Sequence, residues 1–233
     1  MNMNGYRNLD LMWASVEDDA QTHEPQDVSQ IRDAATSHGL PQGSVAQGEF
    51  LEFLVRLLHV QSIITVGTGA VADIMRLVNG LDGSGQLTAV DSSDRGINAI
   101  RAMIAGIDDS TETTLRAVRA PVDVFLPRLN AGDYDLIVVG GDISNYSRSF
   151  EQAPRLLRSG GVIVLTDAMG MADSNGEHGI PDSNDDSDRT MQMRELLDSV
   201  RSDERFDTTL TSIGTGTLIA HLQSSSAGRA ARR

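Results

Sequence analysis

The segment from Ile63 to Ala70, with the sequence Ile-Ile-Thr-Val-Gly-Thr-Gly-Ala, constrains the fold more than any other part of this chain. Its first half is a short run of mostly β-branched residues, which is typical of a strand buried on both faces of a parallel sheet. Gly67 and Gly69 then allow a sharp turn, because glycine has no Cβ to restrict the backbone. Apolar residues at helical spacing follow from 70 to 79. The pattern predicts the first half of a βαβ unit, whose turn lets a ligand approach the main chain closely.

A second strand is expected from Gln86 to Val90, and Asp91 stands at its carboxyl end. In nucleotide-binding α/β folds, an acidic residue at about this distance from the glycine turn accepts hydrogen bonds from the ribose hydroxyls. A Gly-x-Gly turn alone is a weak signal, since it also occurs where no ligand binds. Together with Asp91, it favours a ligand that contains a nucleoside.

The rest of the chain alternates between strand and helix patterns. Further strands are expected at 114–118, 135–139 and 162–166. Further helices are expected at 45–58, 94–107, 150–158 and 191–202, and Ser159-Gly160-Gly161 fits the C-terminal stop of the third of these. Two apolar runs around Gly214 predict a terminal hairpin, and the polar segment 169–189 is expected to be a mobile loop. This order predicts an α/β, doubly wound, Rossmann-like fold with a mostly parallel seven-stranded sheet and an antiparallel C-terminal hairpin strand.

The two ends of the chain differ from its middle. Residues 9–20 and 27–38 have helical patterns, so residues 1–40 are expected to form an N-terminal helical cap. Residues 41–223 contain all the expected strands and are assigned to the ligand-binding domain. The small, polar residues 224–233 are expected to form a disordered tail.

Composition excludes several classes of function. The formal net charge is -14, so nucleic acid is not an expected partner, because binding to phosphates needs clustered basic residues. No apolar run approaches the roughly 20 residues that span a bilayer, and no secretory leader is evident, so a cytoplasmic location is expected. There are no cysteines. All 19 basic residues are arginine, which excludes a mechanism based on a lysine.

The ordered motifs of this chain resemble those of class I S-adenosylmethionine-dependent methyltransferases. Within that class they are most similar to the catechol and caffeoyl-CoA type O-methyltransferases, including actinobacterial members. The resemblance rests on Ile64 to Ala70, Leu87 to Asp91, Phe125 to Leu129, Tyr134 to Val139, Leu156 to Val164 and Ile213 to Leu218. It implies S-adenosylmethionine as the cofactor and a small-molecule hydroxyl acceptor, and it is compatible with a homodimer.

The resemblance also implies which residues hold the cofactor. Gly67, Thr68 and Gly69 would face its methionine part. Asp91, with Ser92 beside it, would accept hydrogen bonds from the ribose hydroxyls. Asp123 falls where the family often has a polar residue near the adenine amino group, and Asp142 is assigned to the same cofactor site. Asp73 stands where the family often has a serine that binds the cofactor carboxylate.

The family's metal site is not preserved in this sequence. Metal-dependent members carry Asp-x-x-Lys after the fourth strand and Asp-Asn after the fifth, whereas here the matching positions are Gly140, Ile143, Asp167 and Ala168. Mg²⁺ needs several hard oxygen ligands, so no metal is predicted. Asp142 would replace a missing ligand only with local rearrangement. Asp167 is the catalytic candidate, as the group that orients the acceptor or accepts its proton; the alternative is that it caps the helix that follows.

Three hypotheses follow. The first is a metal-independent O-methyltransferase that works mainly by holding its reactants together. The second is a catalytically silent protein with the same fold that retains affinity for S-adenosylmethionine or S-adenosylhomocysteine, or acts through a partner. The third is a nicotinamide-dependent dehydrogenase, which is disfavoured because Val71 replaces the third glycine and no Tyr-x-x-x-Lys pair is present.

Overall fold

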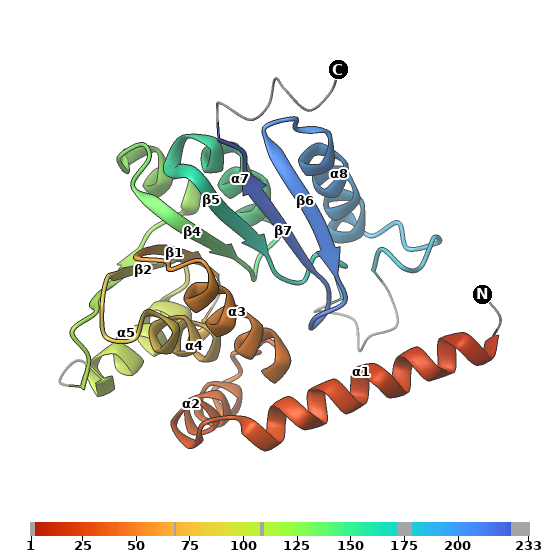
Figure 1. Ribbon diagram of the computed structural model, residues 1–233, viewed down its shortest axis with the longest axis horizontal. Coiled ribbons are helices and arrows are strands. Elements are labelled where there is room, and N and C mark those ends of the chain that lie inside the picture. Colours follow the sequence, from red (N-terminus) through yellow and green to blue (C-terminus); the bar gives the residue numbers. More distant parts are fainter. Residues whose placement is uncertain (1–2, 68, 108–109, 172–178, 225–233) are drawn as a thin grey trace.

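A single sheet of seven strands forms the centre of the protein, in the order β3-β2-β1-β4-β5-β7-β6 (Figure 1). The computed structural model describes residues 3–67, 69–107, 110–171 and 179–224. The strands are β1 (Ser62–Val66), β2 (Gln86–Asp91), β3 (Thr114–Arg119), β4 (Tyr134–Val139), β5 (Leu157–Leu165), β6 (Phe206–Thr211) and β7 (Thr217–Leu222). Neighbouring strands from β3 to β5 are parallel, and β7 runs antiparallel to β5 and β6. The predicted mixed sheet is therefore confirmed.

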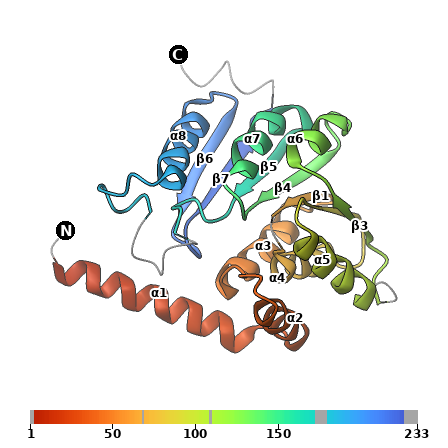
Figure 2. The ribbon, with the colours of Figure 1, turned by 180° about the vertical axis from the view of Figure 1, so that it is seen from behind.

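Helices cover both faces of this sheet. They are α1 (Met3–His23), α2 (Gln26–Ser37), α3 (Val45–Leu57), α4 (Val71–Leu81), α5 (Asp94–Ile107), α6 (Val122–Phe125), the 3₁₀ turn η2 (Leu126–Arg128), α7 (Ser144–Leu156) and α8 (Asp188–Ser202). α3, α4 and α5 lie on one face, and α6, α7 and α8 cover the other (Figure 2). None of the helices in the described ranges is long and apolar enough to cross a membrane.

The alternation of side chains along β1 explains the two layers. Ile63 belongs to the apolar core under α3 and α4, whereas Ile64 belongs to the core under α7 and α8. Both side chains are completely buried. Because successive residues of a strand point to opposite faces, a strand that is buried at every position, as β1 is, has to be covered by helices on both sides.

The start of β5 differs from the expectation. The helix predicted at 150–158 is α7, which begins at Ser144 and ends at Leu156, and the expected stop at Ser159–Gly161 lies inside β5. The pairing of β4 with β5 shifts register between Tyr134 and Leu136. Gly160 has φ 83°, so the glycines admit an irregularity in the strand instead of ending a helix.

α1 extends away from the sheet and contacts the body of the protein through α3 (Figure 1). Both oxygens of the Glu17 carboxylate accept hydrogen bonds at the start of α3, from the amides of Val45 at 2.6 Å and Ala46 at 3.2 Å. Ser44 Oγ accepts a third, from Gln47 N at 3.1 Å. These bonds pair the amides that a helix leaves open at its N-terminus. The division into a cap and a ligand-binding domain stays a prediction, and the predicted tail, apart from Ser224, lies outside the described residues.

Candidate functional site

The carboxyl ends of β2, β1, β4 and β5 form one continuous edge. Backbone hydrogen bonds join them in order, from Gly67 N to Val90 O at 3.3 Å, from Gly140 N to Val66 O at 2.8 Å, and from Thr166 N to Val139 O at 2.9 Å. Parallel sheets bind ligands at this edge, where the loops leave the strands. Asp91 is the last residue of β2, and the glycine turn, Gly140 and Asp167 follow β1, β4 and β5. The structure therefore brings the main sequence candidates to one edge of the sheet.

The glycine turn is tied directly to Asp91. Gly69 has φ 75°, a conformation that favours glycine, and its N–H donates to Asp91 Oδ2 at 2.7 Å. The other oxygen, Oδ1, accepts from Ser93 N at 2.7 Å. Asp91 is only 3% exposed. The carboxylate thus fixes the turn after β1 against the turn after β2, while each oxygen keeps lone pairs for further donors. Thr68, the middle residue of the turn, lies outside the described residues.

Gln42 holds the same turn from the opposite side. Its Nε2 donates to Gly69 O at 2.9 Å, and its Oε1 accepts from Ala72 N at 3.0 Å. Helix α4 has no side-chain cap from its own N-cap residue, Ala70, so Gln42 supplies that cap from a distant part of the chain. Sequence reasoning missed Gln42, because a glutamine shows no pattern when its partners are so far along the chain.

At the other end of the edge, Asp167 pairs with a residue that the sequence did not indicate. Asp167 is 8% exposed and has φ 51°. Its Oδ1 accepts from Met171 N at 3.1 Å, and its Oδ2 is bonded to Nη2 of Arg189 in the first turn of α8. The Arg189 guanidinium also lies 3.5 Å from Gly141 O. A guanidinium, a permanent cation, therefore contacts both the end of β5 and the loop after β4.

Tyr146 is a buried side chain close to Asp167 and Arg189. Its side chain is completely buried, and its hydroxyl donates to Thr166 O at 2.9 Å. Burial raises the pKa of Tyr146, and the nearby Asp167 carboxylate raises it further. The hydroxyl therefore stays protonated and acts as a donor within the fold.

Three other predicted cofactor residues lie in exposed positions. Ser92 and Asp123 are exposed. Ala120 N donates to Asp91 O at 3.2 Å, so the loop that leads to Asp123 begins beside Asp91. Asp142 is exposed and its Oδ1 accepts from both Ser144 N at 2.9 Å and Ser144 Oγ at 2.6 Å, which lowers the pKa of Asp142. Asp142 therefore organises the start of α7 in this structure.

The polar segment at 169–189 is only partly described, because 172–178 lie outside the described residues. In the described part, Asp185 Oδ2 accepts from Gly179 N at 2.6 Å and from Thr190 Oγ1 at 2.9 Å. The Arg194 guanidinium donates to the carbonyls of Asp182 and Asp185. These bonds fold the end of the segment against α8, while its expected mobility stays a prediction.

A buried carboxyl group, that of Asp73, lies in the helix that follows the glycine turn. Asp73, in the first turn of α4, is 5% exposed; its Oδ2 accepts from Gln47 Nε2 at 2.7 Å, whereas its Oδ1 has no hydrogen-bond partner. Burial raises the pKa of Asp73 from 3.8 to about 6, although the Gln47 hydrogen bond and the charges of Arg32 and Arg76 lower it. The ionised form of this carboxyl is therefore destabilised by the fold.

This carboxyl should make the protein less stable as the pH rises. The pKa of Asp73 is higher in the folded chain than in the unfolded chain, so the folded chain binds more protons between pH 4 and 6 and the free energy of unfolding falls across that range. Asp73→Asn should remove this fall and raise the unfolding free energy at pH 7 by about 2 kcal/mol. Urea denaturation at several pH values measures both effects. An unchanged pH slope in the variant would contradict this account of Asp73.

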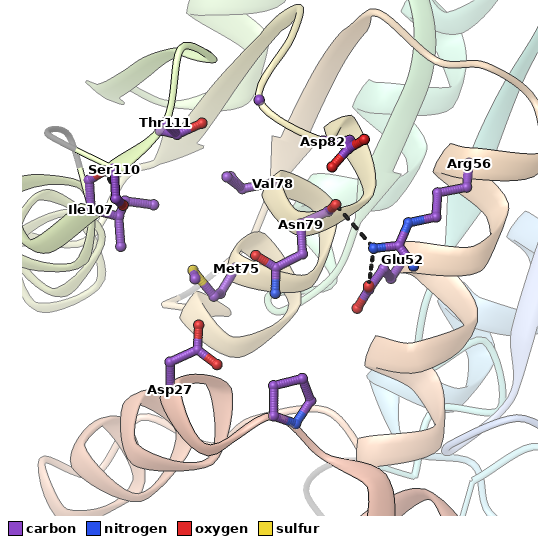
Figure 3. Close-up of a pocket in the computed structure, with 12 residues that line it drawn as sticks. Asp27, Glu52, Arg56, Met75, Val78, Asn79, Asp82, Ile107, Ser110 and Thr111 are labelled. Carbon is purple, nitrogen blue, oxygen red and sulfur yellow. Dashed lines mark hydrogen bonds and ion pairs between the residues drawn. The ribbon is translucent and has the colours of Figure 1, made fainter.

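Two hollows in the described surface are lined by helices on the α3–α5 side of the sheet. One, of about 470 Å³, lies beside the C-terminal end of α4 and is lined by several polar residues (Figure 3). There Arg56 is paired with Glu52 at 2.7 Å and donates to Asn79 O at 3.3 Å. The other, of about 550 Å³, lies among α2, α4 and α5 and is mainly apolar. Neither is lined by Asp91 or Asp167.

Comparison with known proteins shows which family this chain resembles. A family model described as O-methyltransferase matches residues 17–222. A Mycobacterium ulcerans protein with the name "Putative O-methyltransferase" is 30% identical over 191 residues, which make up 81% of each chain. The similarity therefore extends over most of both proteins.

Solved structures with the same fold have lower sequence identity. The O-methyltransferase from Bacillus cereus, solved in complex with SAH, has a TM-score of 0.74 at 20% identity, with 91% of this chain and 99% of that chain covered. The O-methyltransferase TomG from Streptomyces achromogenes, involved in tomaymycin synthesis and solved in complex with SAM, has a TM-score of 0.67 at 19% identity, with 86% and 91% covered. These likenesses establish the Rossmann-like fold.

Proposed function

We propose, because this chain belongs to the O-methyltransferase family, that it transfers a methyl group from S-adenosylmethionine to a hydroxyl oxygen of a small molecule without a divalent metal ion. The sulfonium of S-adenosylmethionine supplies an electrophilic methyl group. The protein's contribution is to hold the acceptor oxygen in line with that group and to manage the acceptor's proton. SAH and SAM in the solved structures with the same fold support this cofactor.

Asp91 fits the ribose of this cofactor, and the glycine turn beside it is proposed to face the methionine part. Each Asp91 oxygen accepts one backbone N–H, so lone pairs remain for the two ribose hydroxyls. A Cβ on Gly67 would lie 3.7 Å from the backbone of Gly140, so the turns after β1 and β4 are in van der Waals contact. Thr68, Ser92 and Asp123 remain proposed contacts, and Asp142 is proposed with the reservation that it already binds Ser144.

Asp167 and Arg189 are proposed to act on the acceptor. The acceptor's hydroxyl proton passes to the Asp167 carboxylate as its oxygen forms the new bond to the methyl carbon, and the electrons of the broken carbon–sulfur bond remain on sulfur. The Arg189 guanidinium stabilises the negative charge that develops on the oxygen. Their ion pair, with both side chains mostly buried, is the observation that supports this proposal most directly.

The same pair argues against a metal at this site. A divalent ion requires several oxygen ligands, but Gly140, Ile143 and Ala168 provide none, and Asp167 already binds a guanidinium. In the part of the chain that the structure describes, no three acidic or histidine side chains are grouped so that they could hold a metal ion. The donor set therefore does not fit Mg²⁺.

The packing around Gly140 also disfavours the aspartate that metal-dependent members of the family carry at this position. A Cβ on Gly140 would lie 2.7 Å from Thr166 Oγ1, which donates to Val139 O at 3.0 Å. An aspartate at this position would have to displace that hydroxyl and break its bond. Glycine is thus packed into the end of β4.

Methyl transfer should therefore not depend on added metal. We expect the rate of methyl transfer from S-adenosylmethionine, measured with a panel of phenols and other hydroxyl acceptors, to be unchanged within about twofold by EDTA or by Mg²⁺. The reason is that Arg189, rather than a metal ion, supplies the positive charge next to Asp167. Loss of activity in EDTA with recovery in Mg²⁺ would disprove this part of the proposal.

The alternative of a catalytically silent binding protein predicts affinity for S-adenosylhomocysteine without turnover on any acceptor.

The expected homodimer and cytoplasmic location remain parts of the proposal. α1 exposes several large apolar side chains, including Leu11 at 70% and Trp13 at 45%. A second copy of the chain could cover this face, and sedimentation velocity would measure it.

A further inference from the structure

We propose that the apolar hollow among α2, α4 and α5 is a second ligand site, which binds a small apolar molecule with one carboxylate. The hollow has a volume of about 550 Å³, within the range of pockets that hold small molecules. It contains neither Asp91 nor Asp167, so the proposal does not rest on methyl transfer.

Small side chains on facing helices create the hollow. Ala34 and Ala35 of α2 lie across from Ala99 and Ala102 of α5, and Leu40 and Val71 contribute further apolar surface. α2 packs against α4, and α4 against α5, so the hollow lies where three helices meet and the alanines leave space between them. An apolar ligand would bury this surface and gain free energy from its removal from water.

The ionisable side chains that line the hollow in the described part of the chain are all basic. Among the described residues, neither aspartate nor glutamate lines it, and the ionisable lining residues are Arg95 and His38. The protein as a whole has a net charge of -14, so a lining with cationic but no acidic side chains is unusual for its surface. An apolar molecule that also carries a negative charge is the ligand that matches both features.

Arg95 has donors left for such a ligand. Its guanidinium makes one long contact, from Nη1 to Gly39 O at 3.5 Å, and has no carboxylate partner within the described ranges. The neighbouring Asp94 is instead paired with Arg119 at 3.0 Å. A guanidinium binds a carboxylate through two parallel N–H···O bonds, and Asn98, one turn further along α5, offers an amide at the same mouth.

The binding of octanoate tests the site, with octanol as the uncharged probe of similar size. Calorimetric titration of the full chain should show saturable binding of octanoate at one site, and weaker binding of octanol. Arg95→Gln should weaken octanoate about tenfold and leave octanol unchanged, because only the carboxylate interaction is removed. Arg101→Gln is the matched control, since Arg101 is exposed on the same helix and does not line the hollow.

Filling the hollow provides an independent measurement. Ala102→Phe and, from the opposite wall, Ala34→Phe should each abolish saturable binding of both probes, whereas Ala105→Phe on the exposed side of α5 should leave it unchanged. Thermal melting by circular dichroism shows that each variant is folded. The proposal is overturned if octanoate does not bind saturably, if both filling variants bind it like the unmodified protein, or if octanol binds as tightly as octanoate.

Discussion

Replacing Asp91 by alanine is expected to weaken the binding of S-adenosylhomocysteine about 10- to 150-fold. This range corresponds to the loss of about 1.5–3 kcal/mol, which is typical of hydrogen bonds to a charged group. The structure gives the change a second consequence, because the same carboxylate accepts the amides of Gly69 and Ser93. Without it, the glycine turn also loses the contact that holds it against β2. Isothermal titration calorimetry measures the dissociation constant.

Two variants separate these contributions. Asp91→Asn keeps one side-chain oxygen as an acceptor and should lose less affinity than Asp91→Ala. Asp94→Ala is the matched control, because Asp94 is exposed and pairs only with Arg119 in the described part of the chain. An unchanged dissociation constant in folded Asp91→Ala would show that Asp91 does not hold the cofactor.

Replacing Asp167 by asparagine is expected to lower kcat about 10²- to 10⁴-fold, the range for the loss of a general base. Asparagine suits this position, because it tolerates the left-handed backbone that Asp167 adopts, with φ 51°. Its one side-chain oxygen can still accept from either the Met171 amide or Arg189, but its amide nitrogen cannot accept from the other. The substitution therefore preserves the shape while it removes the negative charge and one local hydrogen bond.

The control for this experiment is Asp188→Asn, since Asp188 is exposed in the same turn of α8 as Arg189. Its kcat should match that of the unmodified protein, and the affinity for S-adenosylhomocysteine should be similar in all three proteins. If Asp167→Asn turns over within about threefold of the unmodified rate, Asp167 is not the proton acceptor.

Local patterns in the sequence predicted the parts of the fold that depend on neighbouring residues. The run from Ile63 to Val66 indicated a buried strand, because each of its positions has to be covered on one face or the other. Gly69 indicated a turn, because glycine is free to adopt a positive φ, and in the structure its φ is 75°. The position of Asp91 at the carboxyl end of the next strand was also predicted from the local pattern. The order of the elements then determined the sheet topology.

The same local patterns were wrong where one signal fits two structures. Gly160 and Gly161 fit the end of a helix as well as an irregular strand, and only the pairing of β5 with β4 decides between them. The partners of distant residues were not predictable either. Gln42 and Arg189 reach Gly69 and Asp167 through the folded chain, and neither belongs to a recognisable local motif.

Titration of the unmodified protein with S-adenosylhomocysteine in a buffer that contains EDTA tests the central claim most directly. The account predicts saturable binding at one site per chain, with the same dissociation constant when Mg²⁺ replaces EDTA, because Asp91 needs no metal to hold the ribose hydroxyls. A folded protein that binds no S-adenosylhomocysteine, or that binds it only with Mg²⁺, would contradict the account.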